Sequence, residues 1–253
     1  MTRTWNAAVS AAILALLAAC GGGDDDPAGT ETGATPTAAS RLVTEDFNRG
    51  TTGWTGESAD YSTSTAPTEV AFGQRSIKDL GYPDGTNAYY IGGHNNSDDA
   101  LLYIKKQYTG FVANTEYTVT IQAANFLTNA PTGCMGVGGA PGESVYVIAA
   151  ASPTEPKPVD TNGEIRLNID RGNQGTAGTA SMLLGNIANG LPCDGTTKYA
   201  AKLSKNTTGV KVKTDASGNI WVVFGIDSGF EATSSIYLQS LIIGFVPVVA
   251  TTT

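Results

Sequence analysis

Residues 115–122 read Thr-Glu-Tyr-Thr-Val-Thr-Ile-Gln. Apolar side chains stand at positions 117, 119 and 121, and polar side chains stand between them. Because successive side chains of a β-strand point to opposite faces, this alternation predicts a strand with one buried face and one face in water. The β-branched and aromatic content of the stretch also favours a strand.

Similar runs recur from Arg41 onward, separated by clusters of Gly, Asn, Asp and Pro, and long amphipathic helices are absent from the pattern. We predict strands over residues 42–47, 87–92, 101–107, 115–125, 144–150, 164–170, 209–214, 220–225 and 235–245. Many short strands joined by turns predict an all-β fold, an antiparallel β-sandwich or jelly roll. The segment 213–219 contains Gly218 and predicts a hairpin that pairs the strands on either side of it.

The first 19 residues have the pattern of an export signal. They carry one cation, Arg3, and an apolar stretch over 7–19 that is too short to span a bilayer. The stretch ends Leu17-Ala18-Ala19-Cys20, which resembles the lipobox at which bacterial lipoproteins are cleaved and acylated. The resemblance implies that residues 1–19 are removed and that Cys20 carries lipid that anchors the chain in a membrane. Gly21 after the cysteine resembles lipoproteins sent to the outer membrane, and leaves open whether the protein faces the periplasm or the cell surface.

The next segment, 20–40, is composed after its cysteine of Gly, Ala, Thr, Pro, Ser and acidic residues, without Leu, Ile, Val or aromatic side chains. It cannot bury enough apolar surface to offset the entropy of ordering, so we expect a flexible, disordered tether. The simplest division is then a signal peptide over 1–19, an acylated linker over 20–40 and one sandwich domain over 41–250.

The two remaining cysteines, Cys134 and Cys193, form an even pair in a chain predicted to be exported. Oxidation is permitted outside the cytoplasm, so we predict that they form a disulfide. The alternative is two buried free thiols. A bond closing a loop of about 60 residues would stabilise the fold by about 4 kcal/mol, and it would pin the glycine-rich loops 131–142 and 185–195.

Charge and motifs exclude several classes of function. The 253 residues contain 23 acidic and 15 basic side chains, a formal net charge of −8, which argues against a nucleic-acid partner because such surfaces rest on clustered Lys and Arg. The glycine-rich segment 136–142 lacks the following Lys and Ser or Thr of a phosphate loop, so no nucleotide partner is expected. With one histidine and no G-x-S-x-G motif, serine-hydrolase chemistry is also excluded.

The only histidine, His94, opens a polar loop that includes Asn96, Asp98 and Asp99. His94 and Asn96 are candidate ligand-binding residues. The loop is rich in oxygen ligands, so Asp98 and Asp99 are candidate ligands for Ca²⁺, the one cofactor that the sequence suggests. The alternative is a solvated turn between two strands.

Three carboxylates in glycine-containing loops, Glu143, Asp227 and Glu231, are candidate catalytic groups. Two carboxylates about 5–9 Å apart could hydrolyse a glycosidic bond, but the sequence does not supply that distance. The alternative is that they accept backbone hydrogen bonds and hold loops in place. We therefore assign no catalytic residue and expect a binding protein more than an enzyme.

Residues 45–54, Glu-Asp-Phe-Asn-Arg-Gly-Thr-Thr-Gly-Trp, resemble the opening of jelly-roll carbohydrate-binding modules. Trp54 in this segment is a further candidate ligand-binding residue, since aromatic rings stack on sugars, although aromatic residues more often fill a core. Residues 133–147 and 221–231 are similar to a group of uncharacterised bacterial lipoproteins with a jelly-roll domain. The resemblance covers nearly all of 41–246 and implies the fold, but no established activity.

These observations together predict a lipid-anchored protein of the bacterial cell envelope, at the outer membrane, whose jelly-roll domain binds a glycan or another envelope ligand. Two alternatives remain open. One is a carbohydrate-active enzyme that uses the loop carboxylates, and the other is a structural or assembly protein of the envelope without a small-molecule ligand.

Overall fold

The computed structural model describes residues 36–51 and 53–249. Cys20, the predicted signal peptide and most of the predicted tether lie outside the described residues, so the predicted division of the chain stays a prediction. The regular structure of the described residues consists almost wholly of β-strands. Among the described residues, no helix has the length and apolar character needed to cross a membrane.

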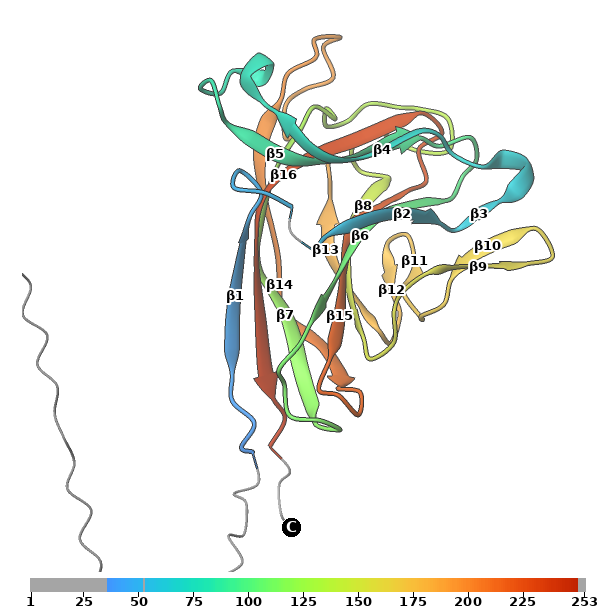
Figure 1. The fold of residues 1–253 in the computed structure, drawn as a ribbon. Helices are drawn as coiled ribbons and strands as arrows, with labels where there is room; N and C mark the ends of the chain where they lie inside the picture. Colours follow the sequence, from blue (N-terminus) through green and yellow to red (C-terminus); the bar gives the residue numbers. More distant parts are fainter. Residues whose placement is uncertain (1–35, 52, 250–253) are drawn as a thin grey trace, which may run out of the picture. The chain divides into compact units, whose positions relative to one another are not determined.

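The strands form two main antiparallel sheets that pack face to face, which confirms the predicted β-sandwich of jelly-roll type (Figure 1). Sheet A has the order β14 (Ala200–Lys213), β7 (Glu116–Thr128), β16 (Thr233–Pro247), β5 (Asn87–His94) and β4 (Thr68–Ser76), with β1 (Arg41–Asp46) also paired to β16. Sheet B has the order β13 (Ser181–Asn186), β8 (Val145–Ser152), β15 (Ile220–Ser228), β6 (Ala100–Tyr108) and β2 (Thr55–Ala59).

The core between the sheets follows from the alternation in the strands. Tyr117, Val119 and Ile121 of β7 are buried there, as their spacing predicts. Thr120, predicted on the wet face, is buried as well, because the irregular part of β14 around Gly209 passes over it. Each main sheet therefore has one face in the core and one outer face, and the outer faces differ.

The outer face of sheet B is covered by residues 153–180, which we call the excursion because they depart from sheet B between β8 and β13. The excursion contains the short strands β9 (Pro158–Thr161), β10 (Glu164–Leu167), β11 (Gly172–Asn173) and β12 (Thr176–Ala177), and β10 also pairs with β3 (Tyr61–Ser62). Leu167 of the excursion packs on Leu101, Tyr103 and Val223 of sheet B. This contact forms a second, smaller core.

Two short 3-10 helices, Thr63–Thr65 and Lys78–Leu80, complete the regular structure. The start of β1 pairs with the end of β16, Arg41 opposite Phe245, so the first and last described strands meet at one end of the domain. Figure 1 shows this end at the bottom and β4 and β5 near the top.

The predicted hairpin over 213–219 is wrong. The strands on either side of it do not pair, because β14 belongs to sheet A and pairs with β7, whereas β15 belongs to sheet B and pairs with β6 and β8. The segment is an arch from one sheet to the other.

The turn within this arch is held by side-chain hydrogen bonds. Its Asp215 carboxylate accepts hydrogen bonds from the backbone N–H groups of Ser217 and Asn219, each at 2.8 Å. Gly218 has a φ of 71° and no room for a Cβ beside the Phe111 carbonyl oxygen. The same turn chemistry thus serves a sheet-to-sheet connection, which a local pattern does not distinguish from a hairpin.

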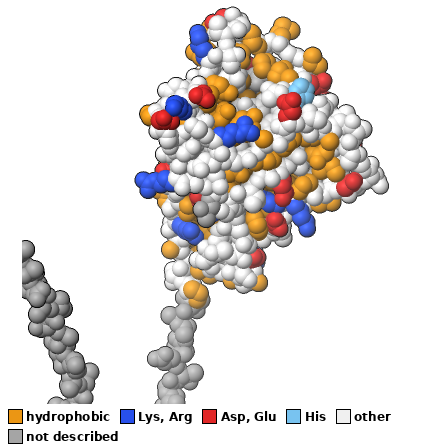
Figure 2. All heavy atoms as spheres, turned by 45° about the horizontal axis from the view of Figure 1, so that its top comes forward, with side chains coloured by type: hydrophobic (Ala, Val, Ile, Leu, Met, Phe, Trp, Pro, Cys, Tyr) orange, Lys and Arg blue, Asp and Glu red, His pale blue; other side chains and the backbone are white. Residues whose placement is uncertain are grey.

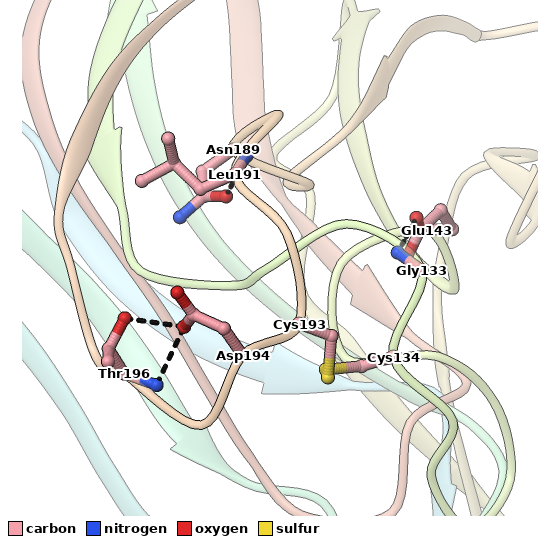
Figure 3. The surroundings of a disulfide bond; sticks show 8 residues. All are labelled: Gly133, Cys134, Glu143, Asn189, Leu191, Cys193, Asp194 and Thr196. Atoms are coloured by element: carbon pink, nitrogen blue, oxygen red, sulfur yellow. Dashed lines mark hydrogen bonds between the residues drawn. A yellow bond between two sulfur atoms is a disulfide. The ribbon is translucent and has the colours of Figure 1, made fainter.

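The predicted disulfide between Cys134 and Cys193 is confirmed. Figure 3 shows that it joins the two loops at positions near Gly133 and Asp194. The same loops also meet through the backbone, where the Thr132 N–H donates to the Leu191 carbonyl at 2.8 Å. The loops are therefore held to each other covalently and by hydrogen bonding.

Candidate functional site

The outer face of sheet A carries a cluster of three half-buried tyrosines, Tyr90 of β5, Tyr237 of β16 and Tyr199 just before β14. The rings of Tyr90 and Tyr237 lie 5.1 Å apart between centroids, and those of Tyr199 and Tyr237 lie 5.6 Å apart, both edge to face. The strand alternation causes this: the neighbours of Tyr90 and Tyr237 on each strand point into the core, so these rings point outward. We call Tyr90, Tyr199 and Tyr237 the tyrosine face.

Two neighbours shape the tyrosine face. The guanidinium carbon of exposed Arg75 lies 3.5 Å from the centroid of the Tyr90 ring, a cation–π stack. Gly92 leaves room for the Tyr90 side chain, because a Cβ there would lie 2.4 Å from the Tyr90 hydroxyl oxygen. Burial, followed by the neighbouring tyrosines, raises the pKa of Tyr199, so its hydroxyl stays protonated.

Polar side chains flank the tyrosine face along the same strands. On one side the Asn125 amide donates to the Ser240 hydroxyl at 2.9 Å. On the other side the His94 Nδ1 lies 3.1 Å from the Thr233 hydroxyl oxygen, and the register pairs Thr233 with His94 and Ser235 with Gly92. The face thus presents aromatic surface between groups that donate and accept hydrogen bonds.

A pocket of about 170 Å³ adjoins this face at Thr233 and Ser235 and is also lined by Ser234, Ile187 and Pro141. The Ser234 hydroxyl oxygen is buried and has no hydrogen-bond partner. Figure 2 looks onto the end of the molecule that carries β4 and β5, and shows hydrophobic side chains exposed among charged and polar ones. Such a mixed surface suits a ligand that is itself part apolar and part polar.

The three predicted ligand-binding residues are not in one place. His94 lies on the outer face of sheet A beside the tyrosine face. Asn96 lies in the following loop, where its amide donates to the Ala66 carbonyl at 2.7 Å. Trp54 is 5% exposed and packs edge to face on Phe47 and Tyr108 in the main core, so its ring is not presented to a ligand. The opening segment that suggested Trp54 serves the core instead.

The candidate carboxylate Asp227 lies on the outer face of sheet B, under the excursion. Its side chain is 0% exposed, and its Oδ2 accepts hydrogen bonds from the Arg171 guanidinium and from the Gln174 backbone N–H, the latter at 2.6 Å. Arg171 is 5% exposed and also donates through Nε to Asp60 at 2.5 Å. Arg171 therefore ties the excursion to two carboxylates that belong to sheet B and its margin.

The candidate calcium ligand Asp99 joins the same group of charges. Its Oδ2 accepts a hydrogen bond from Arg166 at 2.9 Å, and its Oδ1 lies 3.6 Å from an Arg171 nitrogen. The carboxylate of Asp99 is thus directed at two arginines, whereas the side chain of Asp98 is exposed. Among the described residues, no three His, Cys, Asp or Glu side chains are grouped to hold a metal ion.

Burial decides the protonation of these acids. It raises the pKa of Asp227 to about 7; the Arg171 guanidinium opposes the rise, and the Asp99 and Asp60 carboxylates add to it. Burial likewise raises the pKa of Asp99, although Arg171 and Arg166 act in the other direction. Three carboxylates around one buried guanidinium leave an excess of negative charge, which a proton relieves.

The other two candidate catalytic carboxylates lie near the disulfide loops. Glu143 Oε1 accepts a hydrogen bond from the Gly133 backbone N–H at 2.7 Å (Figure 3). The Glu231 backbone N–H donates to the Val137 carbonyl at 2.9 Å, and its side chain packs beside Gly138. The contacts of Glu143 and Asp227 match the structural alternative, in which carboxylates hold loops through backbone N–H groups.

The sequence analysis did not identify several residues of these two regions. Tyr237 and Tyr90 could have been identified, since each is an aromatic residue at a position where the alternation predicts the outer face of the sheet. Asp60 and Arg171 could not, because they stand 111 residues apart in polar segments and meet only in the folded chain.

No family model matches this sequence, and a search of curated proteins returned no match. Solved structures of similar fold include the K1 cleaved adhesin domain of Lys-gingipain from Porphyromonas gingivalis W83, at 9% identity and a TM-score of 0.36 over 80% of this chain and 97% of that one. TmCBM61, solved with β-1,4-galactotriose, has 10% identity and a TM-score of 0.33 over 78% and 92% of the two chains. TmCBM27, a carbohydrate-binding module that recognises mannan, has 10% identity and a TM-score of 0.30 over 82% and 98%. We carry no ligand over from likeness at this level.

Proposed function

We propose that this chain is a lipid-anchored protein of the bacterial cell envelope, at the outer membrane, and that its sandwich domain binds a glycan chain on the tyrosine face. The observation that carries the proposal is the convergence of Tyr90, Tyr199 and Tyr237 from three separate segments onto one outer face. These rings are half-buried: Tyr199 and Tyr237 pack on a small buried cluster of Ile77, Ala88 and Leu127, and the exposed part of each ring is available to a ligand.

A glycan fits the chemistry of this face. A sugar ring presents C–H groups on its flat faces and hydroxyls around its edge. Tyrosine rings contact the C–H faces, and the flanking polar groups of Asn125, Ser235 and His94 can hydrogen-bond the hydroxyls. A glycan is thus met by aromatic surface where it is apolar and by donors and acceptors where it is polar.

The position of the face also fits an anchored protein. Along β16, Tyr237 lies eight residues from Phe245, the partner of Arg41 at the start of the domain. At about 3.3 Å per residue, this separation is about 26 Å. A tether that enters at Arg41 would therefore hold the tyrosine face away from the membrane-proximal end.

The binding proposal is tested with the full chain purified in a detergent without a sugar headgroup. A panel of soluble polysaccharides is examined by affinity electrophoresis and isothermal titration calorimetry. We expect at least one polysaccharide to bind. Tyr237→Ala should weaken that binding about tenfold, which corresponds to a loss of about 1.4 kcal/mol in binding free energy. A loss of this size matches the contribution of one aromatic contact, about 0.5–1.5 kcal/mol.

The matched control is Tyr61→Ala, which removes a half-buried tyrosine from β3, away from sheet A. It should leave the affinity unchanged. Tyr237→Leu removes the aromatic ring but keeps apolar contact with the sheet. Thermal unfolding of this variant shows whether a loss of binding comes from loss of the ring or from loss of folding. The proposal fails if no polysaccharide binds, or if Tyr237→Ala and Tyr61→Ala weaken binding equally.

The anchoring proposal has its own readout. Mass spectrometry of the protein isolated from membranes should find Cys20 as the first residue and carrying acyl chains. A Cys20→Ser variant should appear in the soluble fraction, because attachment then lacks its lipid. An unmodified Cys20 in the native protein would contradict the anchor without affecting the binding proposal.

A further inference from the structure

A second cavity lies on the other side of the sandwich, beneath the excursion. It has a volume of about 250 Å³ and is lined by Asp60, Asp99, Arg166, Arg171, Gly172 and Asn173. Ligand pockets commonly span about 300–1,000 Å³, so this cavity suits one small unit and not a chain. We call it the aspartate–arginine cavity.

The cavity is lined by equal numbers of carboxylates and guanidiniums, because Asp227, the third carboxylate at Arg171, is fully buried and is not part of the lining. Asp60 is joined to Arg171 at 2.5 Å, and Asp99 is joined to Arg166 at 2.9 Å. A ligand with a net negative charge would meet the carboxylates, and one with a net positive charge would meet the guanidiniums. Burying a charge without a free partner is costly. The lining therefore favours a neutral ligand.

The hydrogen-bonding groups of the cavity call for a ligand that both donates and accepts. Asp99 Oδ1 is buried and accepts no hydrogen bond, because the nearest Arg171 nitrogen is 3.6 Å away. Arg166 is half exposed and uses one terminal nitrogen for Asp99 and the other for Glu164, which leaves N–H groups of its five to spare. Asn173 adds an amide. A hydroxyl group can donate to a carboxylate and accept from a guanidinium at the same time.

The walls of the cavity are held in place before any ligand arrives. Asp60 has a φ of 62°, and its backbone N–H donates to the Ile165 carbonyl at 2.8 Å. Gly172 has a φ of 78° and no room for a Cβ, which would lie 2.0 Å from the Thr176 carbonyl oxygen. The Ser181 hydroxyl donates to the Arg171 carbonyl at 2.6 Å. Backbone held in a sparsely populated conformation is common at binding sites, and a rigid site loses little entropy on binding.

We propose that the aspartate–arginine cavity binds a single neutral, polyhydroxylated unit, such as one saccharide residue, through hydrogen bonds to Asp99, Arg166 and Asn173. This site is independent of the tyrosine face, which lies on the outer face of the opposite sheet. Among the described residues that line the cavity none is aromatic, so recognition depends on the arrangement of hydroxyls and not on ring stacking. The unit is either a free sugar or the terminal residue of a longer glycan.

The test uses the full chain in a detergent without a sugar headgroup and ligand-observed NMR by saturation transfer. The probes are the methyl α-glycosides of glucose, galactose and mannose, together with the free sugars. We expect one stereoisomer to bind in preference to the others. Binding of both the free sugar and its methyl glycoside allows either source, whereas binding of the glycoside alone indicates a terminal residue.

Two substitutions of exposed cavity residues test the site. Arg166→Ala and Asn173→Ala should each weaken binding, Arg166→Ala by about tenfold or more because it removes bonds from a charged donor. The matched control is Arg49→Ala, which removes an arginine that is 87% exposed and paired only with Asp46. Thermal unfolding confirms that each variant is folded.

The outcomes separate the two proposed sites. Tyr237→Ala should weaken polysaccharide binding and leave the methyl glycoside signal intact, whereas Arg166→Ala should weaken glycoside binding and leave polysaccharide binding intact. The cavity proposal is overturned if no probe binds, if Arg166→Ala and Asn173→Ala bind as well as Arg49→Ala, or if the glycoside signal is lost in Tyr237→Ala.

Discussion

The two outer faces of this sandwich differ in chemistry and in cover. The outer face of sheet A lies away from the excursion and carries the tyrosine face, where the exposed Arg75 stacks on Tyr90 and a small apolar cluster around Ile77 packs against Tyr199 and Tyr237. The outer face of sheet B is covered by the excursion and carries Arg171 with three carboxylates, Asp60, Asp99 and Asp227. An open face can hold aromatic rings for a ligand at little cost to the fold. A covered face that contains charges must satisfy each of them.

Because of this difference, stability and binding are expected to depend on different faces of the sandwich. Side chains of the tyrosine face should matter more for a ligand than for the fold, because they are only half-buried and lie outside the main core, on a small cluster of Ile77, Ala88 and Leu127. The charged group under the excursion should matter mainly for the fold, because Arg171 and the buried Lys105 attach the excursion to sheet B; the Lys105 ammonium donates to the Pro156 carbonyl at 2.8 Å.

The largest effect is expected from Arg171→Met, which keeps the volume of the side chain but removes its charge. It leaves Asp60 and Asp227 buried without their cation, and breaking a buried pair in this way costs about 3–5 kcal/mol. The measurement is the free energy of unfolding in urea at neutral pH.

The control for this variant is Arg75→Met on the tyrosine face. It removes an exposed cation–π contact and should cost less than about 1 kcal/mol. Equal losses in the two variants would break the comparison, because they would mean that the two faces contribute alike to the fold.

A second, intermediate effect is the pH dependence of stability. The pKa of Asp227 is raised to about 7 in the folded protein from an ordinary value of 3.8. Between these values the folded protein holds a proton that the unfolded chain has lost, so the free energy of unfolding falls as pH rises, by at most about 1.4 kcal/mol per unit. Above about pH 7 the contribution is gone. Urea unfolding across pH 4 to 8 measures the slope.

Asp227→Asn should flatten that slope, and Asp84→Asn should not, because Asp84 forms an exposed pair with Lys78. The raised pKa of Asp99 acts in the same direction as that of Asp227. Acids whose pKa is lowered, among them Asp170 and Asp215, change the free energy of unfolding only at a pH below this range. A slope that survives Asp227→Asn unchanged would show that the buried acid does not titrate in this range.

The smallest effect is expected from a pair of glycines in β5. Gly92→Ala places a methyl group 2.4 Å from the Tyr90 hydroxyl oxygen and 2.7 Å from Ser235 Cβ, so it should displace the ring and weaken polysaccharide binding several-fold, at a cost in stability of about 1 kcal/mol. Gly93→Ala points into the core, 3.1 Å from Val70 and 3.2 Å from Leu102. It should lower the melting temperature without changing the affinity. Titration calorimetry measures the affinity of both variants for the polysaccharide, and thermal unfolding measures their stability. A change in affinity with Gly93→Ala alone would contradict the placement of the binding site on the outer face of sheet A.

The predicted strands follow a clear physical division. The central strands of both main sheets were all predicted: β7, β16, β5, β8, β15 and β6. The prediction also included β1, β10 and the second half of β14. The strands at the edges of the sheets, β4, β2, β13 and the first half of β14, were not. An edge strand pairs on one side only and buries less, and β4 has no buried residue at all. Its apolar alternation is correspondingly weak.

The candidate sites divide in the same way. The sequence identified Asp227, Asp99 and His94 as chemically notable, since each lies in a polar or glycine-containing segment next to a strand. It did not identify Arg171, Asp60 or Tyr199, because each becomes part of a site through a partner far away in the chain. It also suggested Trp54 for a ligand, and the fold places that ring in the core.

By itself the sequence predicted the all-β class, the central strands and the pairing of the two later cysteines, because strand alternation is local and Cys134 and Cys193 are the two cysteines of the predicted sandwich domain. Only the tertiary structure decided which sheet each strand joins, which outer face stays open and which charges meet under the excursion. Those outcomes depend on contacts between distant segments, such as Asp60 and Arg171, which are 111 residues apart, and no local pattern of side chains encodes which distant segment will be the partner.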